Sequence, residues 1–212
     1  MSKSKSRGRP SDPGLQEMRK NQLINAASEL LKSKSYRSIT IREVAEKAGT
    51  QSAMVSYYFG NKEGLFMAMF EAHADRELVQ LQKALTSSNP LLAFIQTLLK
   101  IFSESPHISR LLVDEVLTRN GEMQRRFIDI LPRRMAKLLP SILSAQQDLG
   151  LLRKDLDPKW AAFSLMTMLI TPFVAKPVRE AAWTISDEDL AGEAWAQHIY
   201  NLFLFGVGGD NQ

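Results

Sequence analysis

Apolar residues recur along most of this 212-residue chain at the three- and four-residue spacing of amphipathic helices. A first helix is predicted over residues 15–32, where one apolar stripe consists of Leu23, Ile24, Ala27, Leu30 and Leu31. We find neither the alternation of a half-buried strand nor the turn signal of a hairpin. The pattern therefore predicts an all-helical protein.

Two short helices follow in the N-terminal part. Thr40 and Glu43 have the spacing of a capping box, which predicts that the second helix begins at Thr40. Gly49 is expected to end this helix, because glycine easily adopts the left-handed backbone found at helix C-termini. A short third helix is predicted over about residues 51–57.

The rest of the chain continues the helical pattern. Asn61 is expected to cap a fourth helix that runs towards Leu85. Pro132 and Pro140 should kink or divide a later helix, since proline lacks the N–H group that a helix interior needs. Beyond a break at residues 86–90, further helices are predicted at about 90–104, 106–119, 122–148, 158–175 and 187–205.

Local signals mark the starts of the last two predicted helices. Asp157 precedes Pro158, which is the arrangement of an N-cap followed by proline in the first turn. Ser186 and Asp189 again have capping-box spacing. Gly150 is expected to stop the helix that comes before them.

Positive charge is concentrated near the N-terminus. Residues 1–62 contain 12 Lys and Arg against 5 Asp and Glu, whereas residues 63–212 contain 15 against 18. Residues 1–14 lack apolar anchors and are expected to form a disordered basic arm, and residues 206–212 a flexible tail. The asymmetry indicates a nucleic-acid-binding end on a different kind of domain; a solvated basic tail is the alternative.

Several functional classes lack the residues they need. The chain has no cysteine, which excludes disulfides and thiol catalysis and fits a cytoplasmic protein. Its three histidines lack metal-ligand spacing, and no phosphate-binding or nucleophile-elbow motif is present. We therefore expect no enzyme activity, metal or cofactor. The N-terminus has no apolar signal segment, and the uncharged run Trp160–Ala175, which no other uncharged run exceeds in length, is shorter than the roughly 20 apolar residues of a membrane span.

The second and third predicted helices, joined by a glycine turn, have the helix-turn-helix pattern, which is a weak signal by itself. The elements around it are Ala26-Ala27, Tyr36, Thr40, the string Ile-x-x-Val-Ala-x-x-Ala-Gly from Ile41 to Gly49, and the tract Tyr57-Tyr58-Phe59-Gly60-Asn61-Lys62-Glu63-Gly64-Leu65. In order and spacing, residues 19–66 resemble the N-terminal domain of the TetR/AcrR family of bacterial transcriptional regulators.

The resemblance implies an all-α fold in which a helix-turn-helix DNA-binding domain (residues 15–62) is joined by the fourth helix to a larger helical domain (residues 63–205) for effector binding and dimerisation. It also implies a homodimer, most often a repressor, that binds palindromic double-stranded operator DNA and is released by a small-molecule effector. An activator of the same family and an architectural protein that binds A·T-rich DNA through the basic arm are the alternatives.

The third predicted helix has no Lys or Arg between residues 50 and 61, so base reading and phosphate binding must fall to different residues. Gln51, Ser52 and Ser56 are expected to read base edges, and Ala53 is small enough to let the helix approach the groove. The alternative is that these residues only cap and solvate a surface helix.

The resemblance assigns phosphate contacts to the residues around that helix. Tyr57 and Tyr58 would bind phosphate through their hydroxyl groups, and Phe59 would point into the core. Lys62 would contact the DNA backbone from the first turn of the fourth helix, where free N–H groups also attract anions. Thr40 would do the same from the start of the second helix.

Three residues depart from the family pattern. Ser35 stands where the family usually has glycine and would be strained if its backbone were left-handed. Thr50 replaces an apolar residue. Ser56 stands where many members have tyrosine, so the base preference of those members does not carry over.

The basic arm contains Arg7-Gly8-Arg9-Pro10, which looks like the core of an AT-hook. Arg7 and Arg9 are expected to enter the narrow minor groove of A·T-rich DNA, where the negative potential is enhanced. Nonspecific attraction to phosphate is the alternative.

The last two predicted helices are the candidates for the dimer interface, because the first of them is apolar nearly all round. The residues expected there are Phe163, Ile170, Leu190, Ala194, Trp195, His198 and Leu202; ordinary core packing is the alternative. Residues 90–180 are expected to hold the effector beside adaptable methionines. The pocket residues suggested there are His107, Arg110, Glu115, Met135 and Thr167, again with core packing as the alternative.

Overall fold

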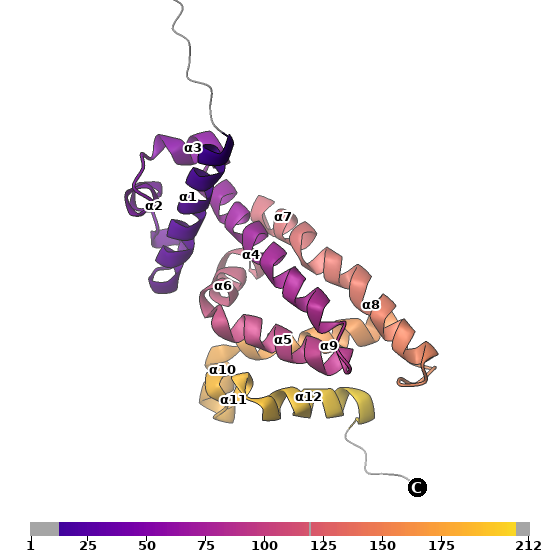
Figure 1. Ribbon diagram of the computed structural model, residues 1–212. Coiled ribbons are helices and arrows are strands. Elements are labelled where there is room, and N and C mark those ends of the chain that lie inside the picture. The colour runs from indigo at the N-terminus through magenta and orange to yellow at the C-terminus, as the bar shows by residue number, and fades with distance from the viewer. Residues whose placement is uncertain (1–12, 119, 207–212) are drawn as a thin grey trace, which may run out of the picture. The chain divides into compact units, whose positions relative to one another are not determined.

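The computed structural model describes residues 13–118 and 120–206 (Figure 1). Every regular element within these two ranges is helical, so the all-helical prediction is confirmed. The chain divides into two compact units that meet inside α4 (Lys62–Ala84), directly after Met69. The predicted domain boundary between residues 62 and 63 lies at the start of this helix, seven residues before the division.

The first unit is a small helical cluster. It is built from α1 (Pro13–Ser33), the 3-10 turn η1 (Tyr36–Ser38), α2 (Ile41–Lys47), α3 (Ala53–Phe59) and the first turns of α4. Its fully buried side chains are Leu23, Ala27, Leu31, Ile39, Val44, Ala45, Val55, Leu65, Phe66 and Met67. Ser35 has a φ of −71°, so the strain considered for a left-handed serine does not arise.

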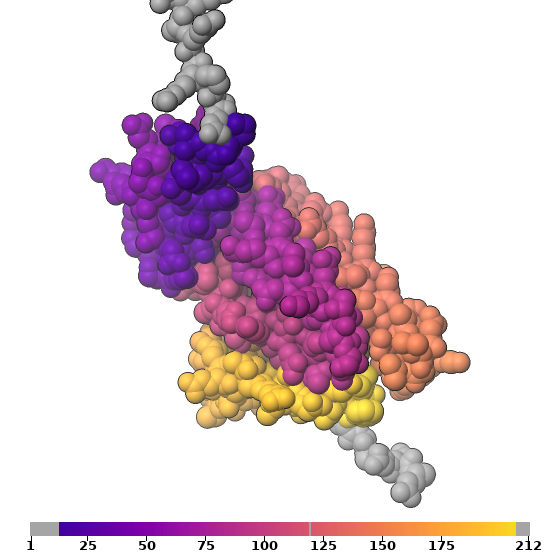
Figure 2. Space-filling view, viewed as in Figure 1, coloured from indigo at the N-terminus to yellow at the C-terminus, as the bar shows by residue number. Residues whose placement is uncertain are grey.

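The second unit contains the rest of α4 and all later helices. These are α5 (Pro90–Glu104), α6 (Pro106–Leu111), the π-helix η2 (Leu112–Leu117), α7 (Glu122–Ile130), α8 (Pro132–Asp148), α9 (Pro158–Val174), α10 (Lys176–Trp183), α11 (Asp187–Ala191) and α12 (Glu193–Phe205). α8 packs along α9, and α5 packs against both α9 and α12. In Figure 2, the C-terminal helices form a continuous outer band of this unit.

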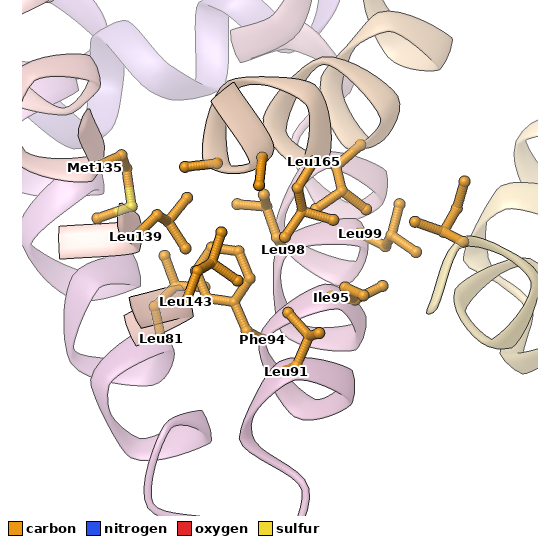
Figure 3. Packing of buried hydrophobic residues seen from close by; sticks show 14 of the residues in the cluster. Leu81, Leu91, Phe94, Ile95, Leu98, Leu99, Met135, Leu139, Leu143 and Leu165 are labelled. Carbon is orange, nitrogen blue, oxygen red and sulfur yellow. The ribbon is translucent and has the colours of Figure 1, made fainter. Parts of the chain in front are cut away.

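The core of the second unit lies between α4, α5, α8 and α9. Figure 3 shows side chains from these helices meeting in one cluster, with Phe94 near its centre. Asn89 caps α5 by accepting a hydrogen bond from the N–H of Leu92 (3.3 Å), and Pro90 follows in the first turn. The cap and the strongly apolar face of α5 explain why this helix was predicted with its observed bounds.

The predicted helices at 106–119, 122–148 and 187–205 are each divided. The first changes to a π-helix after Leu111, and the last is broken at Gly192. Pro132 begins a new helix, as expected, because its missing N–H is not needed in a first turn. Pro140 lies inside α8 without ending it.

α10 is a helix that the sequence pattern did not predict. It ends at Thr184, which has a left-handed backbone (φ 54°) that a β-branched residue rarely adopts. Arg179 closes this turn: its side chain is buried, donates to the carbonyl oxygen of Ser186 (2.8 Å) and pairs with Asp187 (2.5 Å). The predicted N-caps at Asp157 and Ser186 are both confirmed by their side-chain hydrogen bonds.

Candidate nucleic-acid interface

α2 begins with the predicted capping box. The hydroxyl oxygen of Thr40 accepts from the N–H of Glu43 (3.2 Å), and the carboxylate of Glu43 accepts from the N–H of Thr40 (2.8 Å). Lys34 forms an ion pair with the same carboxylate. The ammonium group of Lys34, followed by the backbone N–H and the hydroxyl of Thr40, lowers the pKa of Glu43 to about 2. The start of α2 is therefore fixed by contacts within the unit.

The turn between α2 and α3 directs one side of α3 into the core and leaves the other side exposed. Gly49 has a φ of 67°, as its position at the end of α2 predicted. Val55 is fully buried and anchors α3 in the core. α3 begins at Ala53, two residues later than predicted, so Gln51 and Ser52 lie in the turn before it.

The outer side of this turn and of α3 is polar and uncharged. Gln51, Ser52, Ala53, Ser56 and Tyr57 are all exposed, and the side chain of Tyr57 is 69% exposed. These residues occupy the start of the helix and one of its sides, so they form the surface that can enter a groove. The helix has the small residues and the hydrogen-bonding groups that direct base reading requires.

Tyrosine rings continue this surface towards the end of α3. Tyr58 is half-buried, and its ring meets that of Tyr57 edge to face with centroids 4.9 Å apart. Phe59, expected in the core, is also only half-buried. Phosphate binding by the hydroxyl groups of the two tyrosines, which the resemblance implies, stays a prediction.

Lys62 makes contacts that its sequence position did not reveal. Its ammonium group donates to the carbonyl oxygen of Tyr36 and, more weakly, to that of Arg37 (3.5 Å). The same group lies 4.3 Å from the centre of the Tyr36 ring, which in turn packs edge-on against Phe66. Lys62 thus joins the start of α4 to η1, the turn that leads into α2.

The link between α3 and α4 depends on close backbone contact. The side chain of Asn61 caps α4 by accepting from the N–H of Gly64 (2.8 Å), as predicted. A Cβ atom on Gly64 would lie 2.0 Å from the carbonyl oxygen of Phe59. Gly60 has a φ of 78°, which glycine adopts without strain. These residues set the direction in which α3 leaves the core.

The two arginines predicted to enter the minor groove, Arg7 and Arg9, lie outside the described residues. Their contact with DNA stays a prediction.

The residues predicted for a dimer interface fall into three groups. Phe163, Ala194 and His198 are exposed, whereas Ile170, Trp195 and Leu202 are half-buried. Leu190 is fully buried within its own protomer, so it has no surface to offer a partner and belongs to the core. This placement corrects the prediction for Leu190.

The residues predicted for an effector pocket differ in their burial. Met135 is a core residue, and Glu115 is buried in the π-helix. Arg110 is exposed, as is Thr167, whose hydroxyl donates to the carbonyl oxygen of Phe163 (2.9 Å) on the outer side of α9. His107 is half-buried and influences the pKa of His73, a half-buried histidine whose pKa is lowered to about 4 mainly by desolvation. Their role in an effector pocket stays a prediction.

The part of the chain that the structure describes lacks a metal cluster and a membrane-spanning helix. Among the described residues, no group of three or more His, Asp or Glu is arranged to hold a metal ion. Within the same part of the chain, no single helix is long and apolar enough to cross a membrane; α9 and α10 reach that length only together and are bent by 79°.

Two residues of this unit have contacts that the sequence pattern does not predict. The carbonyl oxygen and the ring of Tyr36 both contact the ammonium group of Lys62. Gly64 lies three residues after the predicted cap Asn61 and four after Gly60, and this spacing is the sequence signal for its close packing.

Family models match both units of the chain. Residues 23–69 match the model described as bacterial regulatory proteins of the tetR family, and residues 89–201 match the C-terminal domain of AefR-like transcriptional repressors. The second match alone covers more than half of the chain. Both compact units are thus accounted for by models of one family.

Individual relatives extend over nearly the full length. The uncharacterized HTH-type transcriptional regulator YvkB of Bacillus subtilis is 27% identical over 200 residues, 89% of this chain and 96% of its own. Among solved structures, FadR from Bacillus subtilis in complex with stearoyl-CoA matches with a TM-score of 0.75 and 18% identity, over 89% of this chain and 99% of its own. AibR in complex with isovaleryl coenzyme A and operator DNA matches with a TM-score of 0.65 and 22% identity, over 89% and 98%. The chain belongs to the TetR family of helix-turn-helix transcriptional regulators.

Proposed function

We propose that this protein is a homodimeric repressor that binds a palindromic operator through α3 and is released by a small-molecule effector. The observation that carries the proposal is the exposed, uncharged edge formed by Gln51, Ser52, Ala53 and Ser56, held in place by buried Val55. Such an edge offers hydrogen bonds to base edges without the sequence-independent attraction that a charged helix would add.

We infer a dimer because a single recognition helix contacts too few bases for specific binding. A single short helix contacts few bases, and helix-turn-helix proteins place two of them in successive major grooves about 34–36 Å apart. Large apolar side chains remain exposed on the C-terminal helices of the protomer. They are Trp160, Phe163, Val178, Trp183 and Phe205. An exposed apolar surface of this kind is typical of a protein–protein interface.

Acyl-CoA thioesters are the effector class that we propose to test first. Two structures with the same fold were solved with such ligands, stearoyl-CoA in one and isovaleryl coenzyme A in the other. The second unit offers a large apolar core in which an acyl chain can be accommodated when the helices move apart. An effector that prefers the separated helices shifts the population away from the operator-binding state.

The operator is tested by selecting bound sequences from random double-stranded DNA with the purified protein. We expect an enriched palindrome, and Gln51→Ala or Ser56→Ala should relax discrimination at single positions by about 1–3 kcal/mol. Gln96→Ala, an exposed glutamine on α5, is the matched control and should leave the motif unchanged. Enrichment of A·T tracts without symmetry would instead favour the architectural function, and the absence of any motif would refute sequence-specific binding.

Repression and release need separate measurements with the selected operator. The protein should lower transcription in vitro from a promoter that overlaps the operator, and an acyl-CoA should restore it. Stimulation of transcription would identify an activator. Failure of acyl-CoAs of all chain lengths to release the protein would exclude this effector class without affecting the assignment of the operator.

Lys62 should hold the interface in position without contacting DNA phosphates, because its ammonium group donates to the carbonyl oxygens of η1. Lys62→Met is expected to weaken operator binding while the slope of log K against log salt stays the same. A lysine that neutralises one phosphate would reduce that slope by about 0.9. The measurement is operator binding by fluorescence anisotropy at several salt concentrations, with exposed Lys83→Met as the control. A reduced slope would show that Lys62 turns to the DNA after all.

A further inference from the structure

Two ion pairs join α4 to α7 and α8 within the second unit, where these helices run beside one another (Figure 1). A carboxylate oxygen of Glu71 lies 3.5 Å from a guanidinium nitrogen of Arg126 in α7. One turn further along α4, Asp75 accepts a hydrogen bond from Arg134 in the first turn of α8 (3.1 Å). The four side chains are between 39% and 68% exposed, so solutes can reach both pairs.

The two ion pairs line a cleft of about 420 Å³, which we call the charged cleft. Asp129 and Ile130 of α7 complete its lining. The charge of Asp129 is balanced by Arg133 (2.6 Å), and Ile130 is buried, so the cleft has an apolar inner side. Sites for small molecules measure about 300–1,000 Å³, and the charged cleft lies within that range.

The arginines of the charged cleft have a spacing that suits neighbouring anionic groups. Glu71 and Asp75 lie four residues apart on α4, about 6 Å along its axis. Since each pairs with one arginine, Arg126 and Arg134 are held at a similar spacing on the opposite wall. A guanidinium group binds phosphate through two parallel hydrogen bonds, which a lysine ammonium group cannot do. Two such groups side by side can therefore hold a diphosphate.

A diphosphate can replace the carboxylates as the partner of these arginines. An ion pair that solvent reaches contributes little to stability, so it is easily exchanged. Phosphate groups offer more acceptor oxygens than a carboxylate and form strong charge-assisted hydrogen bonds with arginine. After the exchange, Glu71 and Asp75 would face a bound anion of their own sign across the cleft, and like charges repel. The bound anion and the closed contact of α4 thus exclude each other.

α4 is the helix through which this exchange would reach the DNA-binding domain. It begins at Lys62 in the first unit and continues beyond Met69 in the second. At its start, Lys62 is tied to η1, the turn that leads into α2. A ligand that prefers α4 separated from α7 and α8 shifts the population towards that arrangement.

We propose that the charged cleft binds the diphosphate of an organic anion through Arg126 and Arg134, which give up Glu71 and Asp75 and thereby release α4. This inference rests on the proposed function and deepens it. Coenzyme A contains a diphosphate, so the cleft would hold the polar end of an acyl-CoA effector. The carboxylates of α4 compete with the effector for the same two arginines.

Isothermal titration calorimetry of the full-length protein tests the cleft with three probes that share a diphosphate: inorganic pyrophosphate, adenosine diphosphate and coenzyme A. We expect all three to bind. Arg126→Met/Arg134→Met should weaken each by roughly ten-fold or more, because charged hydrogen bonds are lost. Arg126→Lys/Arg134→Lys keeps the charge without the planar fork and should weaken them less. Arg125→Met/Lys137→Met removes two exposed cations of the same helices outside the cleft, and this matched control should leave the affinities unchanged.

The carboxylates of α4 should give the opposite sign. Glu71→Gln/Asp75→Asn removes the competing partners, so we expect it to bind pyrophosphate roughly three- to ten-fold more tightly than the native protein. The same variant should bind the operator more weakly in the absence of any ligand, since α4 is no longer held. Carboxylates that only support the fold would not produce a gain in anion affinity. A loss of anion affinity in this variant would overturn the exchange.

The remaining outcomes separate the charged cleft from the proposed function. Binding of coenzyme A without pyrophosphate, or native affinities in Arg126→Met/Arg134→Met, would overturn the diphosphate site. An acyl-CoA that still releases this arginine variant from the operator with native potency would overturn the cleft and leave the proposed function intact. A native protein that binds pyrophosphate in the cleft but selects no operator would overturn the proposed function alone.

Discussion

Gly64→Ala is expected to unfold the first unit and to abolish operator binding. A Cβ atom at this position would lie 2.0 Å from the carbonyl oxygen of Phe59 and 3.1 Å from its carbonyl carbon. These are backbone atoms at the end of α3, so relief requires a shift of that helix. Overpacking typically costs about 1–3 kcal/mol and sometimes more; a clash with backbone should exceed this range.

The effect can be located by comparing two spectroscopic signals. All three tryptophans lie in the second unit, whereas helical circular dichroism reports on both units. On heating, Gly64→Ala should therefore lose part of its helical circular dichroism at a lower temperature than the one at which its tryptophan fluorescence changes. Gly121→Ala is the matched control, because a Cβ atom there meets nothing within 4 Å and its backbone is extended. Native melting and native operator binding of Gly64→Ala would contradict the close packing between α3 and α4.

Phe94→Ala should produce the largest loss of stability in the second unit. Its side chain is 1% exposed and lies among the buried residues of α4, α5 and α8 (Figure 3). Removal of a buried phenylalanine ring from such a core costs about 3–5 kcal/mol, since lost burial and a residual cavity add together. Urea unfolding followed by tryptophan fluorescence measures this loss.

Val79→Ala provides the control for Phe94→Ala. Val79 lies on α4 in the same unit with 65% of its side chain exposed, so its truncation should change the unfolding free energy by less than about 0.5 kcal/mol. A loss below about 1 kcal/mol for Phe94→Ala would mean that the helices around it collapse into the space. In that case, the core would be soft enough to repack around other groups.

Local signals in the sequence were sufficient to predict where most helices begin. The caps at Thr40, Asn61, Asp157 and Ser186 depend on side chains that reach backbone groups two or three residues away, so spacing alone reveals them. Long helices with one apolar face, such as α5, were predicted with their observed bounds. The prediction failed where the pattern was short, as in α10, or where contacts with other helices set the backbone, as in the π-helix.

The candidate interface likewise has some features that the sequence predicts and others that it does not. The exposed side of α3 followed from its uncharged sequence and from buried Val55. The contacts of Lys62 join residues that lie about 25 positions apart, and no local pattern contains such a pairing. The burial of Leu190 and the exposure of Thr167 depend on how whole helices pack, so a periodic stripe could not distinguish the core from the outer face.

The absence of charge on α3 has a consequence for how such a regulator changes over time. On the proposed function, exchanges among uncharged residues at Gln51, Ser52 or Ser56 would alter the preferred operator and leave the electrostatic attraction to DNA as it was. Most such exchanges also spare the fold, because these side chains are exposed and the helix is anchored by Val55. After duplication of the gene, a few such substitutions would therefore let the two proteins control different genes while both keep their affinity for DNA.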